Sequence, residues 1–139
     1  MDWEALKKQI KQHEGMALKP YKDTVGKTTI GYGRNLEDVG ITLEEAEHML
    51  DNDLDRVHTA LQTNFVYFNT LNDVRQRVLM DMCFNIGLVG LKNFRNMHNA
   101  IRQKDYVQAA AAMLNSKWAT QVGQRAKTLA NMMKSGKNE

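Results

Sequence analysis

The chain has 139 residues, of which 42% are hydrophobic and 25% are charged, and its formal net charge is +3. These values suit one globular domain of ordinary composition, and no apolar run approaches the ~18 residues that span a bilayer. The single cysteine, Cys83, excludes an internal disulfide, and its apolar neighbours indicate a buried hydrophobe rather than a nucleophile.

The charge is unevenly distributed along the chain. Residues 1–60 contain 8 Lys and Arg against 12 Asp and Glu, a net of −4, whereas residues 61–139 contain 11 against 4, a net of +7. A basic C-terminal part indicates a surface that faces an anionic polymer. Nucleic acid, anionic lipid and bacterial cell wall all fit at this point, and so does an ordinary solvated surface.

The first predicted elements are a helix and a glycine-rich β segment. Asp2 is a suitable N-cap for a helix over residues 2–14, which Gly15 can end, so Glu14 lies in its last turn. Residues 21–35 lack a helical period, and glycines interrupt their β-branched and aromatic residues. This pattern predicts a short antiparallel sheet.

The remainder of the chain is predicted to be helical. Thr42 and Glu45 form a capping box that opens a long amphipathic helix, expected to end at about residue 62. A strongly apolar helix follows, capped by Asn69 or Thr70 and stopped near Gly87. Three further helices are expected, over residues 93–103, 105–115 and 120–134.

These elements predict an α+β fold in a single domain that spans residues 1–139. A small β-containing lobe covers roughly residues 13–60, and the long helix joins it to an all-helical lobe over roughly residues 61–139. The N-terminal helix, residues 2–14, is expected to pack on the second lobe. No internal repeat, low-complexity segment or linker divides the sequence.

Several kinds of site are excluded because their motifs are missing. The four histidines show neither His-x-x-x-His spacing nor cysteine neighbours, so no zinc site is expected. Residues 51–55 imitate the start of a calcium loop, but Arg56 and Gln62 replace the glycine and the glutamate that such a loop requires. No serine-nucleophile, phosphate-loop or dinucleotide motif is present, so neither a metal nor another cofactor is expected.

Two acids in the glycine-rich segment carry the chemical hypothesis. Glu14 ends a helix against apolar neighbours, which favour a protonated general acid, whereas the polar setting of Asp23 favours an ionised carboxylate. Glycosidic cleavage requires such a contrast, and a hydroxyl of Thr24, Thr28 or Thr29 could orient a water. The alternative at this point is that both acids serve only the turns in which they lie.

The same residues resemble the phage-type lysozymes. In that family a helix-ending Glu is followed by an Asp after eight intervening residues and by a Thr after five more, within a pattern that here is "YKDTVGKTTIGYG". Two further motifs follow in the family's order. They are "MCFNIG" at residues 82–87, which resembles the central helix, and "SKWATQVGQRAK" at residues 116–127, which resembles the C-terminal segment. The likeness covers nearly the whole chain.

The resemblance implies a lysozyme-like fold and an N-acetylmuramidase activity. Such an enzyme hydrolyses the β-1,4 bond between N-acetylmuramic acid and N-acetylglucosamine in peptidoglycan, with inversion and without a cofactor. Glu14 takes the family's general-acid position, and Asp23 and Thr29 take the positions that hold the attacking water. By analogy, Arg125 is expected to pair with Glu14 and to help orient it.

The resemblance also implies a sugar cleft, with two departures from the family pattern. Gly33, Phe84 and Asn85 fall where the family lines this cleft. Many members have a Gln at the position of Asn85, whose shorter side chain alters the sugar contact. Arg34 stands where many members have a histidine, so the acid–histidine bridge of those members cannot form in the same way.

Peptidoglycan is the partner that the resemblance implies. Its acidic peptide stems would attract the basic C-terminal lobe, and we expect neither nucleic-acid binding nor stable membrane insertion. The start of the chain lacks the basic-then-apolar order of a secretory signal. We therefore expect a monomer that stays in the host cytoplasm until a separate membrane-permeabilising protein releases it to the cell wall.

Two other functions remain open. A lytic transglycosylase cuts the same bond but closes the sugar into a 1,6-anhydro ring, and it needs no water holder such as Asp23 and Thr29. A non-catalytic domain that binds cell wall or nucleic acid would not need a protonatable Glu at a helix end. The residue pattern favours hydrolysis over both alternatives.

Overall fold

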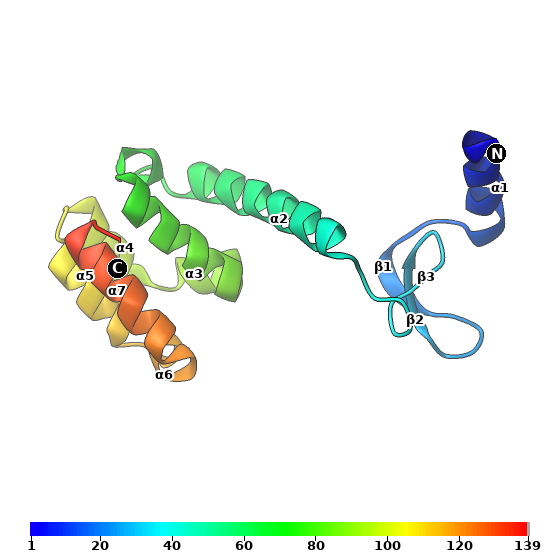
Figure 1. The fold of residues 1–139 in the computed structure, drawn as a ribbon. Coiled ribbons are helices and arrows are strands. Elements are labelled where there is room, and N and C mark those ends of the chain that lie inside the picture. Colours follow the sequence, from blue (N-terminus) through cyan, green and yellow to red (C-terminus); the bar gives the residue numbers. More distant parts are fainter. Residues whose placement is uncertain (139) are drawn as a thin grey trace. The chain divides into compact units, whose positions relative to one another are not determined.

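The computed structural model describes residues 1–138, which divide into two units, Met1–Met49 and Leu50 onward (Figure 1). The boundary between the units falls within the long helix α2. The first unit contains one helix and a three-stranded antiparallel sheet in the order β1-β2-β3. Its elements are α1 (Trp3–Glu14), β1 (Ala17–Lys22), β2 (Thr28–Gly31), β3 (Arg34–Asn35) and the start of α2 (Leu43–Asn64).

The second unit is entirely helical within the described residues. After α2 the chain forms a short 3-10 helix, Phe68–Thr70, and five α-helices. These helices are α3 (Asp73–Lys92), α4 (Arg95–Arg102), α5 (Tyr106–Leu114), α6 (Lys117–Val122) and α7 (Gln124–Ser135). The predicted α+β class is therefore confirmed.

Local hydrogen bonds set the ends of α1, as predicted. Asp2 Oδ1 accepts from Ala5 N at 3.0 Å and so caps the first turn. At the other end Gly15 has a φ of 69°, and its N–H donates to Lys11 O at 3.0 Å. Only glycine adopts this backbone conformation without strain, so α1 ends at Glu14.

The sheet begins earlier than the sequence predicts. β1 starts at Ala17 and includes Pro20, although the strand was expected only after this proline. Proline cannot donate a ladder hydrogen bond, but β1 is an edge strand, and its pairing with β2 is irregular between Ala17 and Tyr21. An edge position with a local irregularity is where a sheet tolerates proline.

The predicted capping box opens α2. Glu45 N donates to Thr42 Oγ1 at 3.1 Å, and Thr42 N donates to Glu45 Oε1 at 2.9 Å. These two bonds satisfy backbone groups that would otherwise lack partners at the start of the helix. α2 then continues to Asn64, two residues beyond the predicted end.

Two predicted helix boundaries in the second unit are wrong, and a third is a kink rather than an end. The N-cap of α3 is Asn72, whose Oδ1 accepts from Arg75 N at 3.0 Å, and not Asn69 or Thr70, because those residues already belong to the 3-10 turn. The predicted helix 120–134 is divided into α6 and α7 at Gly123, whose φ is 60°. Gly87, at a φ of 80°, kinks α3 where its end was expected, and helical backbone resumes as far as Lys92.

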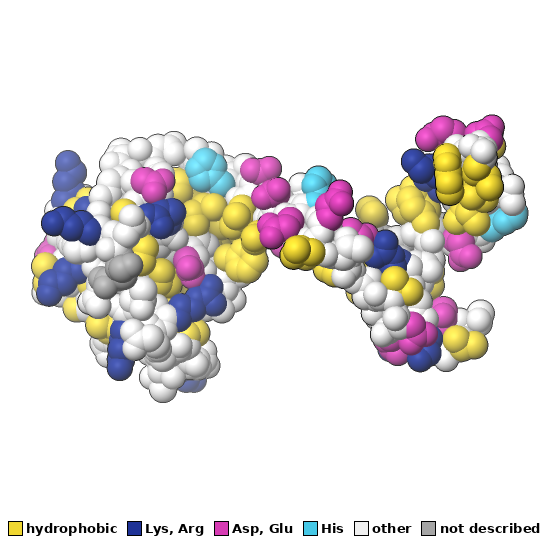
Figure 2. All heavy atoms as spheres, viewed as in Figure 1, with side chains coloured by type: hydrophobic (Ala, Val, Ile, Leu, Met, Phe, Trp, Pro, Cys, Tyr) yellow, Lys and Arg dark blue, Asp and Glu magenta, His cyan; other side chains and the backbone are white. Residues whose placement is uncertain are grey.

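All buried hydrophobic side chains of the described residues lie between Val57 and Met133, in the second unit. Cys83 is among them, 5% exposed, as predicted. Thr29 is the buried side chain of the first unit. None of the helices described is long and apolar enough to cross a bilayer. Figure 2 shows basic side chains spread over the helices of the second unit and acidic ones gathered along α2.

Candidate active site

Glu14 lies at the end of α1 with its carboxylate against the backbone of Gly33. A Cβ atom added to Gly33 would stand 2.7 Å from Glu14 Oε2, and the φ of Gly33 is 79°. The backbone conformation therefore favours glycine at this position, and a larger residue would displace the Glu14 carboxylate. The resemblance predicts that Gly33 lines a sugar cleft. In the structure the atoms nearest to a Cβ built on Gly33 belong to Glu14, the candidate general acid.

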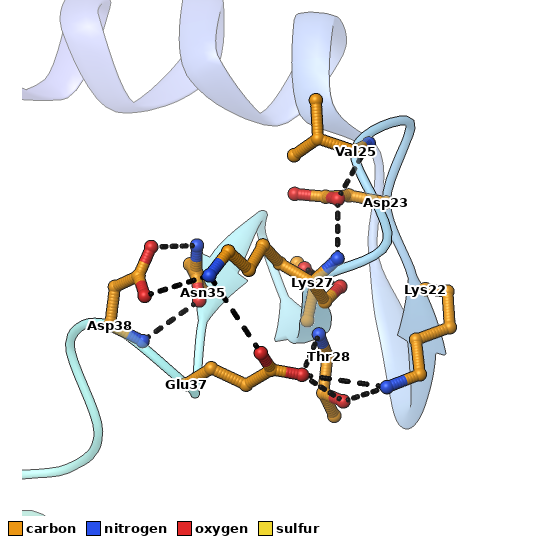
Figure 3. Close-up of polar contacts among 9 residues, drawn as sticks. Lys22, Asp23, Val25, Lys27, Thr28, Asn35, Glu37 and Asp38 are labelled. Carbon is orange, nitrogen blue, oxygen red and sulfur yellow. Dashed lines mark hydrogen bonds and ion pairs between the residues drawn. The ribbon is translucent and has the colours of Figure 1, made fainter.

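Asp23 occupies the turn between β1 and β2, where it uses one carboxylate oxygen to shape the backbone (Figure 3). Its Oδ1 accepts from Val25 N at 3.0 Å and from Lys27 N at 2.8 Å. Within residues 1–138 no hydrogen bond reaches its Oδ2. Asp23 is therefore a turn residue, as the structural alternative proposed, and it still has one oxygen to offer a ligand.

Thr29 lies in the central strand, 3% exposed, and its hydroxyl is held by the same turn. Thr29 Oγ1 donates to Lys27 O at 3.0 Å, and Asp23 N donates to that same carbonyl at 2.9 Å. The hydrogen of the hydroxyl is thus used, so its remaining lone pairs can accept a hydrogen bond from water. The Lys27 peptide joins the two predicted water-holding residues.

Sequence reasoning missed Lys27. Its role depends on its backbone carbonyl and N–H, which the residue type does not reveal. The Lys27 side chain makes contacts outside the turn (Figure 3). Lys27 Nζ pairs with Asp38 Oδ1 at 3.3 Å, and Asp38 Oδ2 accepts from Asn35 Nδ2 at 2.9 Å. Asn35 is the strand partner of Thr29. The contacts through Asp38 therefore link Lys27, just before β2, to the residue of β3 that pairs with Thr29.

The other predicted hydroxyl in β2 is already engaged. Thr28 donates from both N and Oγ1 to Glu37 Oε1, at 3.0 and 2.9 Å (Figure 3). These hydrogen bonds, supported by Lys22, hold the pKa of Glu37 below its ordinary value. Thr28 therefore fixes the segment that follows β3, whereas the Thr29 hydroxyl is tied to the Asp23 turn through Lys27 O.

Arg34 forms a bidentate pair with Glu45. Arg34 Nη1 and Nη2 donate to Oε1 and Oε2 at 2.8 Å each, and Nη1 also donates to Gly40 O at 3.1 Å. Hydrogen bonding to Arg34 lowers the pKa of Glu45 to about 2. Arg34, which stands where many family members have a histidine, therefore joins β3 to the first turn of α2 through an arginine–carboxylate pair.

In the second unit the two predicted downstream motifs contact each other. Trp118 Nε1 donates to Asn85 Oδ1 at 2.8 Å, and Arg125 Nε donates to Asp81 Oδ1 at 2.9 Å. Phe84, beside Asn85, is 46% exposed. The oxygen of the Asn85 amide is thus occupied, which leaves its NH2 group for a ligand. Sugar contacts by Phe84 and Asn85, and a pairing of Arg125 with Glu14, stay predictions.

The side chains of the first unit define a class of chemistry. A carboxyl group beside a glycine backbone can donate a proton, and a carboxylate linked to a buried hydroxyl through the backbone of one residue can hold a water. That is the set of groups with which glycoside hydrolases act. No cluster of three or more potential metal ligands occurs among residues 1–138.

The chain is similar in sequence to known lysozymes and to a phage spike protein. The phage lysozyme family profile matches residues 11–135. "Probable T4-type lysozyme 1" of Dictyostelium discoideum is 26% identical, with 95% of each chain covered. "Endolysin" of Acyrthosiphon pisum secondary endosymbiont phage 1 is 32% identical over 79% of this chain and 74% of its own. "Pre-baseplate central spike protein Gp5" of Enterobacteria phage T4 is 26% identical, with 97% of this chain and 28% of that protein covered.

The chain belongs to the phage lysozyme family, since the family match extends over most of its length. Its α+β architecture is the lysozyme fold, and the resemblance carried by the three sequence motifs is confirmed. Membership makes the chain a glycosidase that acts on peptidoglycan.

Proposed function

We propose that this chain hydrolyses the β-1,4 bond between N-acetylmuramic acid and N-acetylglucosamine, with inversion at the anomeric carbon. Glu14 acts as the general acid, and Asp23 and Thr29 hold the attacking water. The observation that carries the proposal is the Lys27 carbonyl, which accepts from both Asp23 N and Thr29 Oγ1. This arrangement supports a water site because both residues are tied to one peptide group while Asp23 Oδ2 and the lone pairs of Thr29 Oγ1 can still accept hydrogen bonds.

The reaction follows from the donors and acceptors of these residues. Glu14 gives its proton to the glycosidic oxygen as the bond to the anomeric carbon breaks. A water donates one hydrogen bond to Asp23 Oδ2 and one to Thr29 Oγ1, and its oxygen attacks the anomeric carbon from the opposite face of the sugar. Asp23 accepts the proton that the water loses, and solvent then restores both carboxyl groups.

The test removes the acid and the base in separate variants. We expect Glu14→Gln and Asp23→Asn each to slow cleavage of purified peptidoglycan, because general acid–base assistance is worth about 10²–10⁴-fold. In Asp23→Asn the amide oxygen can still accept from Val25 N and Lys27 N, so the turn should persist. Product release is measured by mass spectrometry, and the anomer that forms first is measured by NMR.

Asp2→Asn is the matched control. It makes the same chemical change in the same unit and keeps the cap on Ala5 N, so activity should be retained. Wild-type rates in purified Glu14→Gln would contradict the assignment of the acid. Anhydro sugar products would instead identify a lytic transglycosylase, and binding to peptidoglycan without any product would identify a non-catalytic domain.

A further inference from the structure

The Arg34–Glu45 pair lies next to Gly33, whose backbone faces the Glu14 carboxylate. Arg34 directly follows Gly33, the residue whose backbone meets the Glu14 carboxylate. Three hydrogen bonds fix the guanidinium group, two to Glu45 at 2.8 Å and one to Gly40 O at 3.1 Å. A bidentate pair of this kind restricts orientation as well as distance.

The other end of this pair is also fixed. Glu45 lies in the first turn of α2, and its Oε1 accepts from Thr42 N while its own N–H donates to Thr42 Oγ1. The bond to the carboxylate that receives Arg34 comes from the Thr42 backbone N–H and does not depend on the Thr42 side chain. Any movement of β3 away from α2 would break two parallel hydrogen bonds at once.

We propose that Arg34 is a positioning residue for the general acid. By joining β3 to the first turn of α2, it holds the Gly33 backbone against Glu14 and keeps that carboxyl group aimed at the glycosidic oxygen. This inference rests on the proposed role of Glu14. The Arg34 and Glu45 side chains are 37% and 39% exposed, and exposed ion pairs contribute little to folding. The pair should therefore affect catalysis more than stability.

The decisive variant is Glu45→Gln. Glutamine can serve at this position of a capping box, so the bond from Thr42 N is retained while the ionic, bidentate contact with Arg34 is lost. Thr42→Ala is the matched control, because it removes the side-chain cap and leaves the Arg34–Glu45 pair. Arg34→Lys is a second variant that keeps the charge and loses the fork of donors.

The readouts are kcat and KM on soluble, uncrosslinked peptidoglycan strands, together with the melting temperature. We expect Glu45→Gln and Arg34→Lys to lower kcat by about 10- to 100-fold, with KM little changed, because small displacements of a catalytic group have effects of this size. Thr42→Ala should lower the melting temperature by a few degrees and leave kcat unchanged.

A double variant separates positioning from independent damage. Gly33→Ala places a Cβ against Glu14 Oε2 and should also lower kcat. If Arg34 acts through Gly33, then Gly33→Ala with Glu45→Gln should lose no more than the worse single variant. Losses that multiply would overturn the proposal.

The same series distinguishes this inference from the proposed function. If Glu14→Gln is inactive while Glu45→Gln and Arg34→Lys keep wild-type kcat, the positioning role is wrong and the function stands. An equal loss of kcat in Thr42→Ala would also overturn the positioning role, because the pair is intact there. If Glu14→Gln retains wild-type activity, the proposed function and this inference are both wrong.

Discussion

The His98 side chain is 3% exposed in the core of the second unit and stacks on Phe65, with ring centroids 4.5 Å apart. Its Nε2 lies 2.7 Å from Leu91 O and its Nδ1 lies 2.5 Å from the Tyr67 hydroxyl. Because a carbonyl can only accept, Nε2 carries the hydrogen and Nδ1 accepts from Tyr67. Burial lowers the pKa of His98 and raises that of Tyr67, so both groups are neutral.

This network makes stability depend on pH. The unfolded chain has a histidine of ordinary pKa, about 6.5, whereas the folded pKa is lower, so the unfolded state binds more protons in the acid range. The stabilisation is complete above pH ~6.5 and is lost as the pH falls through the folded pKa. We expect the urea-derived free energy of unfolding to fall between pH 7.5 and 5.5.

The responsible side chain can be identified by substitution. His98→Gln should flatten this pH dependence, although it lowers stability at all pH values by disturbing a buried network. His13→Asn is the control, because His13 is exposed on α1 and should leave the slope unchanged. An undiminished slope in His98→Gln would assign the effect to another group.

At the scale of elements, one face of α3 receives both contacts from the C-terminal helices. Asp81 and Asn85 are four residues apart and therefore share a face of the helix. Asp81 accepts from Arg125 of α7, and Asn85 accepts from Trp118 of α6. The break at Gly123 between α6 and α7 lies between these two donors in the sequence. The family's downstream motifs thus form one joint between helices.

This joint offers a test of Arg125. We expect Arg125→Ala to lower kcat by about tenfold or more and to alter the acid side of the pH–rate profile, because Arg125 is predicted to pair with Glu14. Asp81→Ala removes the observed partner and leaves the cation. Equal losses in both variants would show that Arg125 serves the joint with α3, whereas a loss confined to Arg125→Ala would support the pairing with Glu14.

At the scale of the whole molecule, the apolar core and the candidate catalytic residues belong to different units. The buried hydrophobic side chains run from Val57 to Met133, whereas Glu14, Asp23 and Thr29 lie in the first unit. Among residues 1–138, no buried hydrophobic side chain lies in the first unit. Burial of apolar area is the main favourable term in folding, so local stability should be lower in the first unit.

Native-state amide hydrogen exchange on the full chain measures this difference. We expect amides of β2 to open at a free energy well below the global value and amides of α3 and α7 to open close to it. Equal opening free energies in the two units would contradict the expectation that the first unit, which lacks the apolar core, is locally less stable.

Signals that act within one or two turns were correctly read from the sequence. The Asp2 cap, the Gly15 stop and the capping box of Thr42 and Glu45 each depend on residues no more than four apart. The predicted cap of α3 and the unbroken helix 120–134 were wrong. Asn69, Thr70 and Asn72 can each cap a helix, and the 3-10 turn takes up the first two, which leaves Asn72. Gly123 breaks the second helix through a φ of 60°, a conformation that glycine permits but that its residue type does not require.

The sequence by itself determined the family, the α+β class and the spacing of Glu14, Asp23 and Thr29, because each depends on residue types at fixed separations. Only the tertiary structure decided how these residues are supported. The contact of Gly33 with Glu14, the shared Lys27 carbonyl and the pairing of Arg34 with Glu45 join backbone or side-chain atoms that the folded chain brings together. A residue letter does not specify a carbonyl's partners or the direction of a guanidinium group, since both depend on where other segments lie.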